Sequence, residues 1–201
     1  PLLAESDLPA FFREGLAERA GPISVDPDLF KHPELKHLRH AETPEHYLDL
    51  EYFGDRALPR LRYEYLAMCV ELGVEPTRAG LLPYAVAEWT QRLTQAFVEH
   101  RAAPSDAGIR QKCLIYAGLL AHYAADLHQP LHTTVHYDGR VAEPGAESPR
   151  TGIHMQVDGL LRRMPMDVES VLADREAEQF DDLWAGIIRH LQTSHALVDR
   201  V

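Results

Sequence analysis

The chain has 201 residues, of which 45% are hydrophobic and 25% charged, a composition typical of a globular domain and not of a disordered or collagen-like chain. Acidic residues outnumber Lys and Arg by 31 to 20, and the net charge of -11 argues against an electrostatic clamp on nucleic acid or on an anionic membrane. The 12 histidines point instead to metal chemistry.

The hydrophobic spacing predicts helices nearly throughout the chain and no strand, so we expect one all-α domain over residues 1–201. Two stretches rich in loop-forming residues, 22–43 and 133–151, are predicted loops, and long loops tend to be functional. Turn and cap residues bound the helices: Gly21-Pro22 ends the first, and Ser105 or Asp106 caps the fourth. The predicted helices cover residues 8–20, 59–73, 83–103, 106–128, 153–163, 167–174 and 180–198.

The two cysteines, the apolar runs and the N-terminus say little about function. Cys69 and Cys113 lie in apolar helical patterns, which favours buried free thiols over a bridge between them. No apolar run is long enough to span a membrane. The chain begins at Pro1 without a signal-peptide pattern, so we expect a processed or trimmed product whose targeting information is missing.

The segment from His122 to His132 concentrates chemically active residues on an apolar helix. His122 and Asp126 are four positions apart and therefore lie on one helix face. An ionised carboxylate on a buried helix needs a partner, yet no Lys or Arg lies between Lys112 and Arg140. A cation supplied from outside the chain would neutralise Asp126, and Pro130 would let His132 approach the same place.

A second pair with the same spacing, His154 and Asp158, follows 32 positions later. One such pair is often only a surface hydrogen bond, but two pairs joined by a third histidine are much stronger evidence. Imidazole and carboxylate ligands suit zinc and similar metals, so the sequence predicts a metal cluster in a cleft between buried helices and long loops.

The pattern H-x-x-x-D-x-x-Q-P-L-H over residues 122–132, followed by H-x-x-x-D at 154–158, resembles the superfamily of bacterial zinc-dependent phospholipase C and single-strand-specific zinc nucleases. The resemblance spans residues 28–158 and implies an all-α fold with three zinc ions in a cleft. It also implies matching residues upstream, in Asp28-Leu-Phe-Lys31 and His46-Tyr47-Leu-Asp49.

The resemblance assigns the metal ligands residue by residue. The first zinc would be bound by Asp28, His46, His122 and Asp126, with Asp126 also bridging to the third zinc and Asp26 as an alternative to Asp28. The second zinc would be bound by His132, His154 and Asp158. The family binds its third zinc through an N-terminal Trp and a nearby His, and neither precedes Asp28, so we expect a missing N-terminal segment or a site for two zinc ions.

The same resemblance implies the reaction and its further residues. Zinc would activate a water that attacks a phosphodiester, Asp28 would orient or deprotonate that water, and Lys31 would stabilise the developing charge. Tyr47 and Asp49 would contact the substrate. Relatives are usually exported, which implies a secreted or periplasmic protein.

Three alternatives for the function stay open. Tyr47, and Asp instead of Glu at position 158, favour a nuclease acting locally on single-stranded nucleic acid without wrapping it. The nucleases' Gly-Gly-Asn and Trp-Asp features are absent around His154, which favours a phospholipase C acting on headgroup phosphodiesters. In the third alternative, zinc only staples loops to helices and nothing is catalysed.

Overall fold

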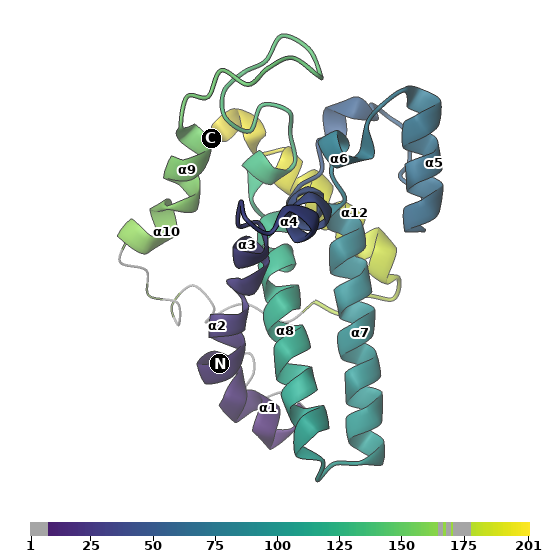
Figure 1. Cartoon of the computed structure of the whole chain (residues 1–201), viewed down its shortest axis with the longest axis vertical. Coiled ribbons are helices and arrows are strands. Elements are labelled where there is room, and N and C mark those ends of the chain that lie inside the picture. The colour runs from purple at the N-terminus through teal and green to yellow at the C-terminus, as the bar shows by residue number, and fades with distance from the viewer. Residues whose placement is uncertain (1–7, 165–166, 168–169, 171–177) are drawn as a thin grey trace.

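Two long antiparallel helices, α7 (Leu82–Ala102) and α8 (Ala107–Leu127), lie side by side along the computed structural model (Figure 1). The structure describes residues 8–164, 167, 170 and 178–201. Asp106 caps α8 by accepting a hydrogen bond from the N–H of Ile109 at 3.0 Å, which satisfies one of the free donors of the first turn. Pro130 follows the end of the helix, where the chain must turn.

The segment before residue 47 is more helical than the sequence predicts, and the predicted loop over 22–43 is wrong. Pro22 and Pro27 lie in the first turns of short helices, where a missing N–H removes no helical hydrogen bond, so proline continues the helical path here. The elements are α1 (Ala10–Gly15), the π-helical turn η1 (Leu16–Ala20), α2 (Gly21–Ile23), α3 (Asp26–Phe30), α4 (Lys36–Glu42) and the 3₁₀ turn η2 (Thr43–His46).

This N-terminal segment runs along α8 (Figure 1) and approaches it closely at one glycine. A Cβ at Gly118 would lie 2.7 Å from the carbonyl oxygen of Ala20 and 2.8 Å from the Cβ of Ile23. Only glycine therefore lets the two backbones approach this far. The close approach places residues 24–28 beside the last turns of α8.

The remaining elements surround the upper half of the α7–α8 pair (Figure 1). Helix α5 ends at Gly73, whose φ of 66° is the left-handed conformation that glycine adopts at helix ends. These elements are η3 (Leu50–Tyr52), α5 (Arg62–Leu72), α6 (Pro76–Ala79), η4 (Pro130–His132), α9 (Ile153–Asp158), α10 (Leu160–Arg163), α12 (Leu183–His195) and η5 (Val198–Arg200).

Two groups of buried side chains form the core. The larger joins α5, α7, α8 and α12, with Trp89 and Trp184 packed against it, and the smaller joins α1 to the lower part of α7 and α8. Cys69 and Cys113 are buried free thiols, as the apolar patterns predict. The all-α prediction is confirmed for the described residues, whose extended pairing is limited to one bridge between Leu48 and Gly80.

The predicted helix over 167–174 falls outside the described residues, apart from positions 167 and 170. Within the described ranges, no helix combines the length and the apolar character that crossing a bilayer requires.

Candidate metal centre

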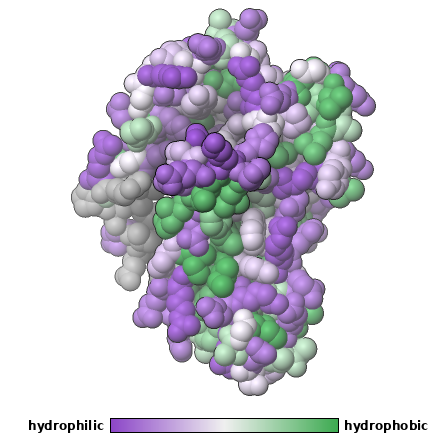
Figure 2. Space-filling view, in the orientation of Figure 1, coloured by the Kyte–Doolittle hydropathy of each residue, from purple (hydrophilic) through white to green (hydrophobic). Residues whose placement is uncertain are grey.

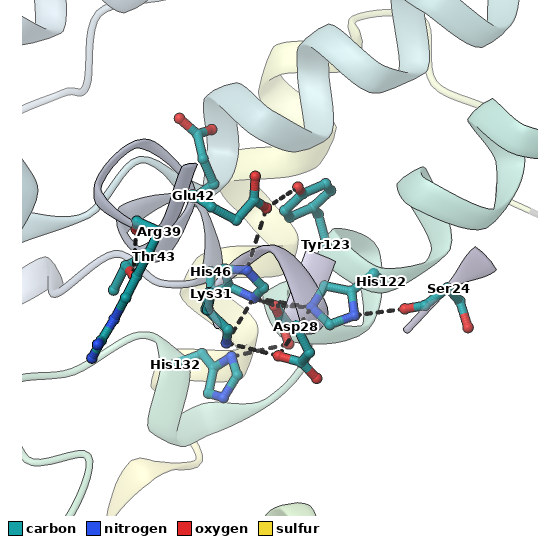
Figure 3. A network of polar contacts seen from close by, with 12 residues as sticks. Ser24, Asp28, Lys31, Arg39, Glu42, Thr43, His46, His122, Tyr123 and His132 are labelled. Carbon is teal, nitrogen blue, oxygen red and sulfur yellow. Dashed lines mark hydrogen bonds and ion pairs between the residues drawn. The ribbon is translucent and has the colours of Figure 1, made fainter. Parts of the chain in front are cut away.

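Three residues from separate elements converge near the upper end of α8, and we call Asp28, His46 and His122 the first histidine group (Figure 3). One ligand atom of each lies within 4.8 Å of the others. The Nε2 of His122 lies 2.9 Å from the Nδ1 of His46 and 3.9 Å from an oxygen of Asp28. His46 is 4% exposed, whereas the carboxylate of Asp28 reaches the surface.

A second set of three residues converges nearby, and we call His132, His154 and Asp158 the second histidine group. The Nε2 of His154 lies 3.2 Å from Asp158, and the Nε2 of His132 lies 3.8 Å from the same carboxylate. The rings of His132 and His154 meet edge to face at 4.9 Å. In the part of the chain that the structure describes, these two are the groups of three or more such residues that could hold an ion.

Asp126 lies between the two groups. Its Oδ2 is 3.0 Å from the Nδ1 of His46 and 3.3 Å from the Nε2 of His122, while its Oδ1 is 3.1 Å from the Nδ1 of His132. One carboxylate thus contacts both groups, because the helical turn that aligns it with His122 ends just before the chain returns at Pro130. This is the geometry of a carboxylate that could bridge two cations.

The charges in this cluster are strongly coupled. Burial alone would raise the pKa of Asp126, but the adjacent imidazoles of His122, His132 and His46 lower it well below its usual range. Burial lowers the pKa of His132, but Asp126 and Asp158 outweigh that effect and raise it to about 9. In the absence of a metal, a proton on His132 therefore provides positive charge beside these carboxylates.

Several buried ring nitrogens have no hydrogen bond, which is costly unless something else satisfies them. Among the described residues, these atoms include both ring nitrogens of His132, the Nε2 of His154 and the Nε2 of His46. Two of these residues, His132 and His154, belong to the second histidine group. The Nε2 of each faces Asp158 but forms no hydrogen bond with it. Imidazole nitrogens and carboxylate oxygens at this spacing fit a borderline metal such as zinc.

Outer contacts hold the candidate ligands in place. The Nδ1 of His122 donates to the carbonyl oxygen of Ser24 at 2.8 Å, which leaves its Nε2 free to bind an ion (Figure 3). The Nε2 of His46 lies 3.4 Å from Glu42, which also accepts a hydrogen bond from the hydroxyl of Tyr123. Such contacts fix the orientation of metal-binding histidines.

The second histidine group has an outer contact of its own. The side-chain amide of Gln129 donates to the Oδ1 of Asp158 at 2.6 Å. The adjacent His132 and the hydrogen bond from Gln129 lower the pKa of Asp158 despite its partial burial. The sequence alone predicts no role for Gln129, Glu42, Tyr123 or Ser24. The position of Glu42 four residues before His46 was the available signal, because it repeats the spacing of the ligand pairs.

Lys31 extends toward the first histidine group. Its Nζ lies 2.7 Å from Asp28 and 3.4 Å from the Nδ1 of His46, so the ammonium stands among the candidate ligand atoms (Figure 3). An ammonium there favours a negative group on an incoming molecule and competes with a metal for the same carboxylate.

The other two residues assigned to the substrate are held differently. The hydroxyl of Tyr47 donates to the carbonyl oxygen of Thr77 at 2.6 Å, and its backbone lies so close to Gly80 that a Cβ there would clash. Asp49 is 8% exposed, and burial, helped by Glu51, raises its pKa to about 8. Neither side chain is brought into the two histidine groups, so their roles toward a substrate stay predictions.

A pocket of about 530 Å³ opens beside the second histidine group. Its lining combines two candidate ligands with a cation and an apolar side chain: His154, Met155, Asp158, Gly159 and Arg163. The volume is in the range of small-molecule sites, and Arg163 gives it a group that suits phosphate.

The structure thus brings together all seven residues predicted as metal ligands, which are Asp28, His46, His122, Asp126, His132, His154 and Asp158. His136, in the loop that follows His132, accepts a hydrogen bond from the N–H of Val141 at 3.1 Å. Comparison with protein-family models, with curated proteins and with solved structures found no match for this chain.

Proposed function

We propose that the chain is a zinc-dependent phosphodiester hydrolase that acts on single-stranded nucleic acid. The observation that carries the proposal is the position of Asp126, whose two oxygens contact two separate groups of candidate zinc ligands. A purely structural zinc site usually has four protein ligands and stands alone, whereas paired ions that share a carboxylate are common in phosphoryl-transfer sites.

Each group of residues has a separate role in this proposal. The first histidine group and Asp126 hold one ion, and the second histidine group holds another. When bound, zinc lowers the pKa of a coordinated water and stabilises negative charge on a phosphoryl group. Asp28, half in solvent, orients or takes a proton from the attacking water, while Lys31 and Arg163 offer positive charge to the phosphate.

The nucleic-acid assignment rests on the resemblance of Tyr47 and Asp158 to the nuclease pattern. The overall charge of -11 does not oppose it, because the candidate cations concentrate positive charge at one place. Binding should accordingly involve one or a few phosphates and should not involve wrapping of a long strand.

Exposed apolar side chains favour a second candidate, a phospholipase C. Val25 and Leu29, 52% and 61% exposed, flank Asp28, and Met155 beside the pocket is 79% exposed. Figure 2 shows hydrophobic surface just below α4, over the region of α3 and the upper part of α8. Such a rim would suit a lipid substrate, since large exposed apolar patches mark interaction sites.

The test combines metal quantification with hydrolysis assays on single-stranded DNA, RNA and phosphatidylcholine. We expect about two zinc ions per chain and zinc-dependent cleavage of single-stranded nucleic acid. Cleavage of phosphatidylcholine alone would select the second candidate. Tightly bound zinc with no hydrolysis of any of the three substrates would favour the third alternative, in which zinc only links loops to helices and nothing is catalysed.

A further inference from the structure

A further pair of histidines, His128 and His190, contacts each other near the surface, and neither belongs to the two histidine groups. His128 follows the last residue of α8, and His190 lies on α12. The Nε2 of His128 is 2.9 Å from the Nδ1 of His190, and the ring centroids are 4.9 Å apart. The pair shares no residue with the candidate metal centre.

The outer nitrogen of each ring is fixed as a hydrogen-bond donor. The Nδ1 of His128 lies 2.7 Å from the carbonyl oxygen of Ala124, and a carbonyl can only accept. The Nε2 of His190 lies 2.7 Å from an oxygen of Glu178, and the other oxygen of that carboxylate is paired with Arg189. An ion-paired carboxylate also accepts, so each ring carries its hydrogen on the outer nitrogen.

The two inner nitrogens face each other at 2.9 Å. Because both outer nitrogens donate, two facing inner lone pairs would repel unless a proton or a metal ion lies between them. A histidine that donates its outer N–H to a carbonyl or carboxylate, and points its other nitrogen inward, has the arrangement typical of a metal ligand. Both members of this pair have that arrangement.

The separation of the nitrogens also indicates a class of metal. Two nitrogens that each lie about 2.05 Å from one ion are 2.9 Å apart when they subtend an angle of about 90°. That angle belongs to the tetragonal coordination of Cu²⁺ or Ni²⁺, whereas tetrahedral zinc needs the nitrogens farther apart. His128 is exposed and His190 is partly exposed, so the remaining coordination positions are open to water.

We propose that His128 and His190 form a separate binding site for one divalent transition-metal ion of the Cu²⁺ or Ni²⁺ type. Glu178 and the carbonyl of Ala124 act as the outer acceptors that orient the two rings. An ion at this place ties α12 to the end of α8. The site is independent of the proposed hydrolase activity.

The experiment measures bound Cu²⁺ per chain by equilibrium dialysis of the chelator-treated, full chain, with electron paramagnetic resonance of the bound copper. We expect His128→Gln and His190→Gln each to bind one Cu²⁺ fewer than the unaltered chain, with loss of a signal from copper held by two nitrogens. His37→Gln, which alters an exposed histidine on α4, is the matched control and should bind the full number. Glu178→Gln should keep the site but weaken it by about 10–100-fold.

Asp126→Asn separates this proposal from the previous one. It removes the carboxylate between the two histidine groups, yet should leave the two-nitrogen copper signal in place. Equal copper content in the unaltered chain, His128→Gln and His190→Gln would overturn the proposal and would mean that a shared proton lies between the two rings. The remaining copper of each variant reports that the fold is intact.

Discussion

Glu42 contacts His46 and Tyr123 through a single oxygen: its Oε1 lies 3.4 Å from the Nε2 of His46 and accepts the hydroxyl of Tyr123 (Figure 3). The buried tyrosine thereby holds the carboxylate, and the carboxylate holds the imidazole, whose Nδ1 points at Asp126. Contacts of this kind orient a ligand before any ion arrives.

Removing either part of this support should weaken zinc binding without preventing it. We expect Glu42→Gln and Tyr123→Phe to lower zinc affinity by about 10–100-fold, because His46 loses its fixed orientation. Competition with a zinc-binding dye measures the change. Tyr116→Phe, on the same helix with its ring packed on Trp89, should leave affinity unchanged, and an equal loss there would contradict a specific role for Glu42.

Asp126→Asn should abolish zinc binding and hydrolysis together. The amide is neutral and cannot bridge two cations, so we expect zinc affinity to fall on the order of 100-fold or more at both groups. Isothermal titration calorimetry and the hydrolysis assay give the two readouts. Asp106→Asn at the other end of α8 is the control, since Asn caps a helix as well as Asp. A fully active Asp126→Asn protein would refute the proposed function.

Lys31→Met should separate metal binding from hydrolysis. The ammonium lies 2.7 Å from Asp28 and 3.4 Å from His46, so its removal relieves repulsion of a cation and should raise zinc affinity by about 10-fold. Hydrolysis should nevertheless fall, because the phosphate loses a positive partner. Lys36→Met on the exposed face of α4 should change neither quantity. A loss of zinc affinity in Lys31→Met would show that the lysine supports the metal site.

The metal-free protein should become less stable as the solution becomes alkaline. Asp126 and Asp158 raise the pKa of His132 to about 9 from its ordinary value of 6.5, so protonated His132 stabilises the folded state fully below that ordinary value. This stabilisation is lost as the pH rises through 9. Urea unfolding of the chelator-treated chain between about pH 6 and pH 9 measures it.

Zinc should reverse this dependence, since an ion replaces the proton on His132 and binds more tightly as the proton leaves. Unfolding with saturating zinc should therefore show higher stability at alkaline pH. In His132→Gln the alkaline loss of metal-free stability should disappear. A slope that is the same in His132→Gln and in the unaltered chain would assign the pH dependence to other groups.

Two glycines at the same helical contact should respond differently to alanine. Gly118→Ala places a Cβ 2.7 Å from the carbonyl of Ala20 and should destabilise the protein by about 1–3 kcal/mol. Gly21 meets no atom beyond its chain neighbours, but it is helical and precedes Pro22, whose ring crowds a preceding Cβ. The helical gain of alanine and this crowding oppose each other, so Gly21→Ala should change the stability by less than about 1 kcal/mol. Urea unfolding of both variants measures the difference. A loss at Gly21→Ala as large as that at Gly118→Ala would mean that the contact needs glycine at both positions.

The sequence predicts the central helices well because their signals are local. Asp106 and Pro130 lie where a cap and a stop are expected, and the spacing of His122 and Asp126 places both on one face of α8. The same local signals mislead before residue 47. Pro22 and Pro27 usually suggest a break, but contacts with α8 hold the chain in short helices there.

Contacts between distant residues are beyond what one sequence reveals. The carbonyl of Ser24 meets His122, 98 positions later, and Glu42 meets Tyr123, 81 positions later. Neither contact leaves a pattern in the chain, because a backbone oxygen has no sequence signature and a lone Glu is ordinary on a helix surface. Both become visible only when packing at Gly118 brings the N-terminal segment to α8.

The placement of Asp126 has a consequence for the order in which ions enter. Because one carboxylate contacts both histidine groups, two zinc ions held as proposed would not bind independently of each other. An ion in the first group orients the shared carboxylate but also repels a second dication. By thermodynamic linkage, the factor by which the first ion changes the affinity for the second equals the factor by which the second ion changes the affinity for the first. Zinc titration of the unaltered chain should therefore give a two-step isotherm in which the affinity of the second step depends on occupation of the first.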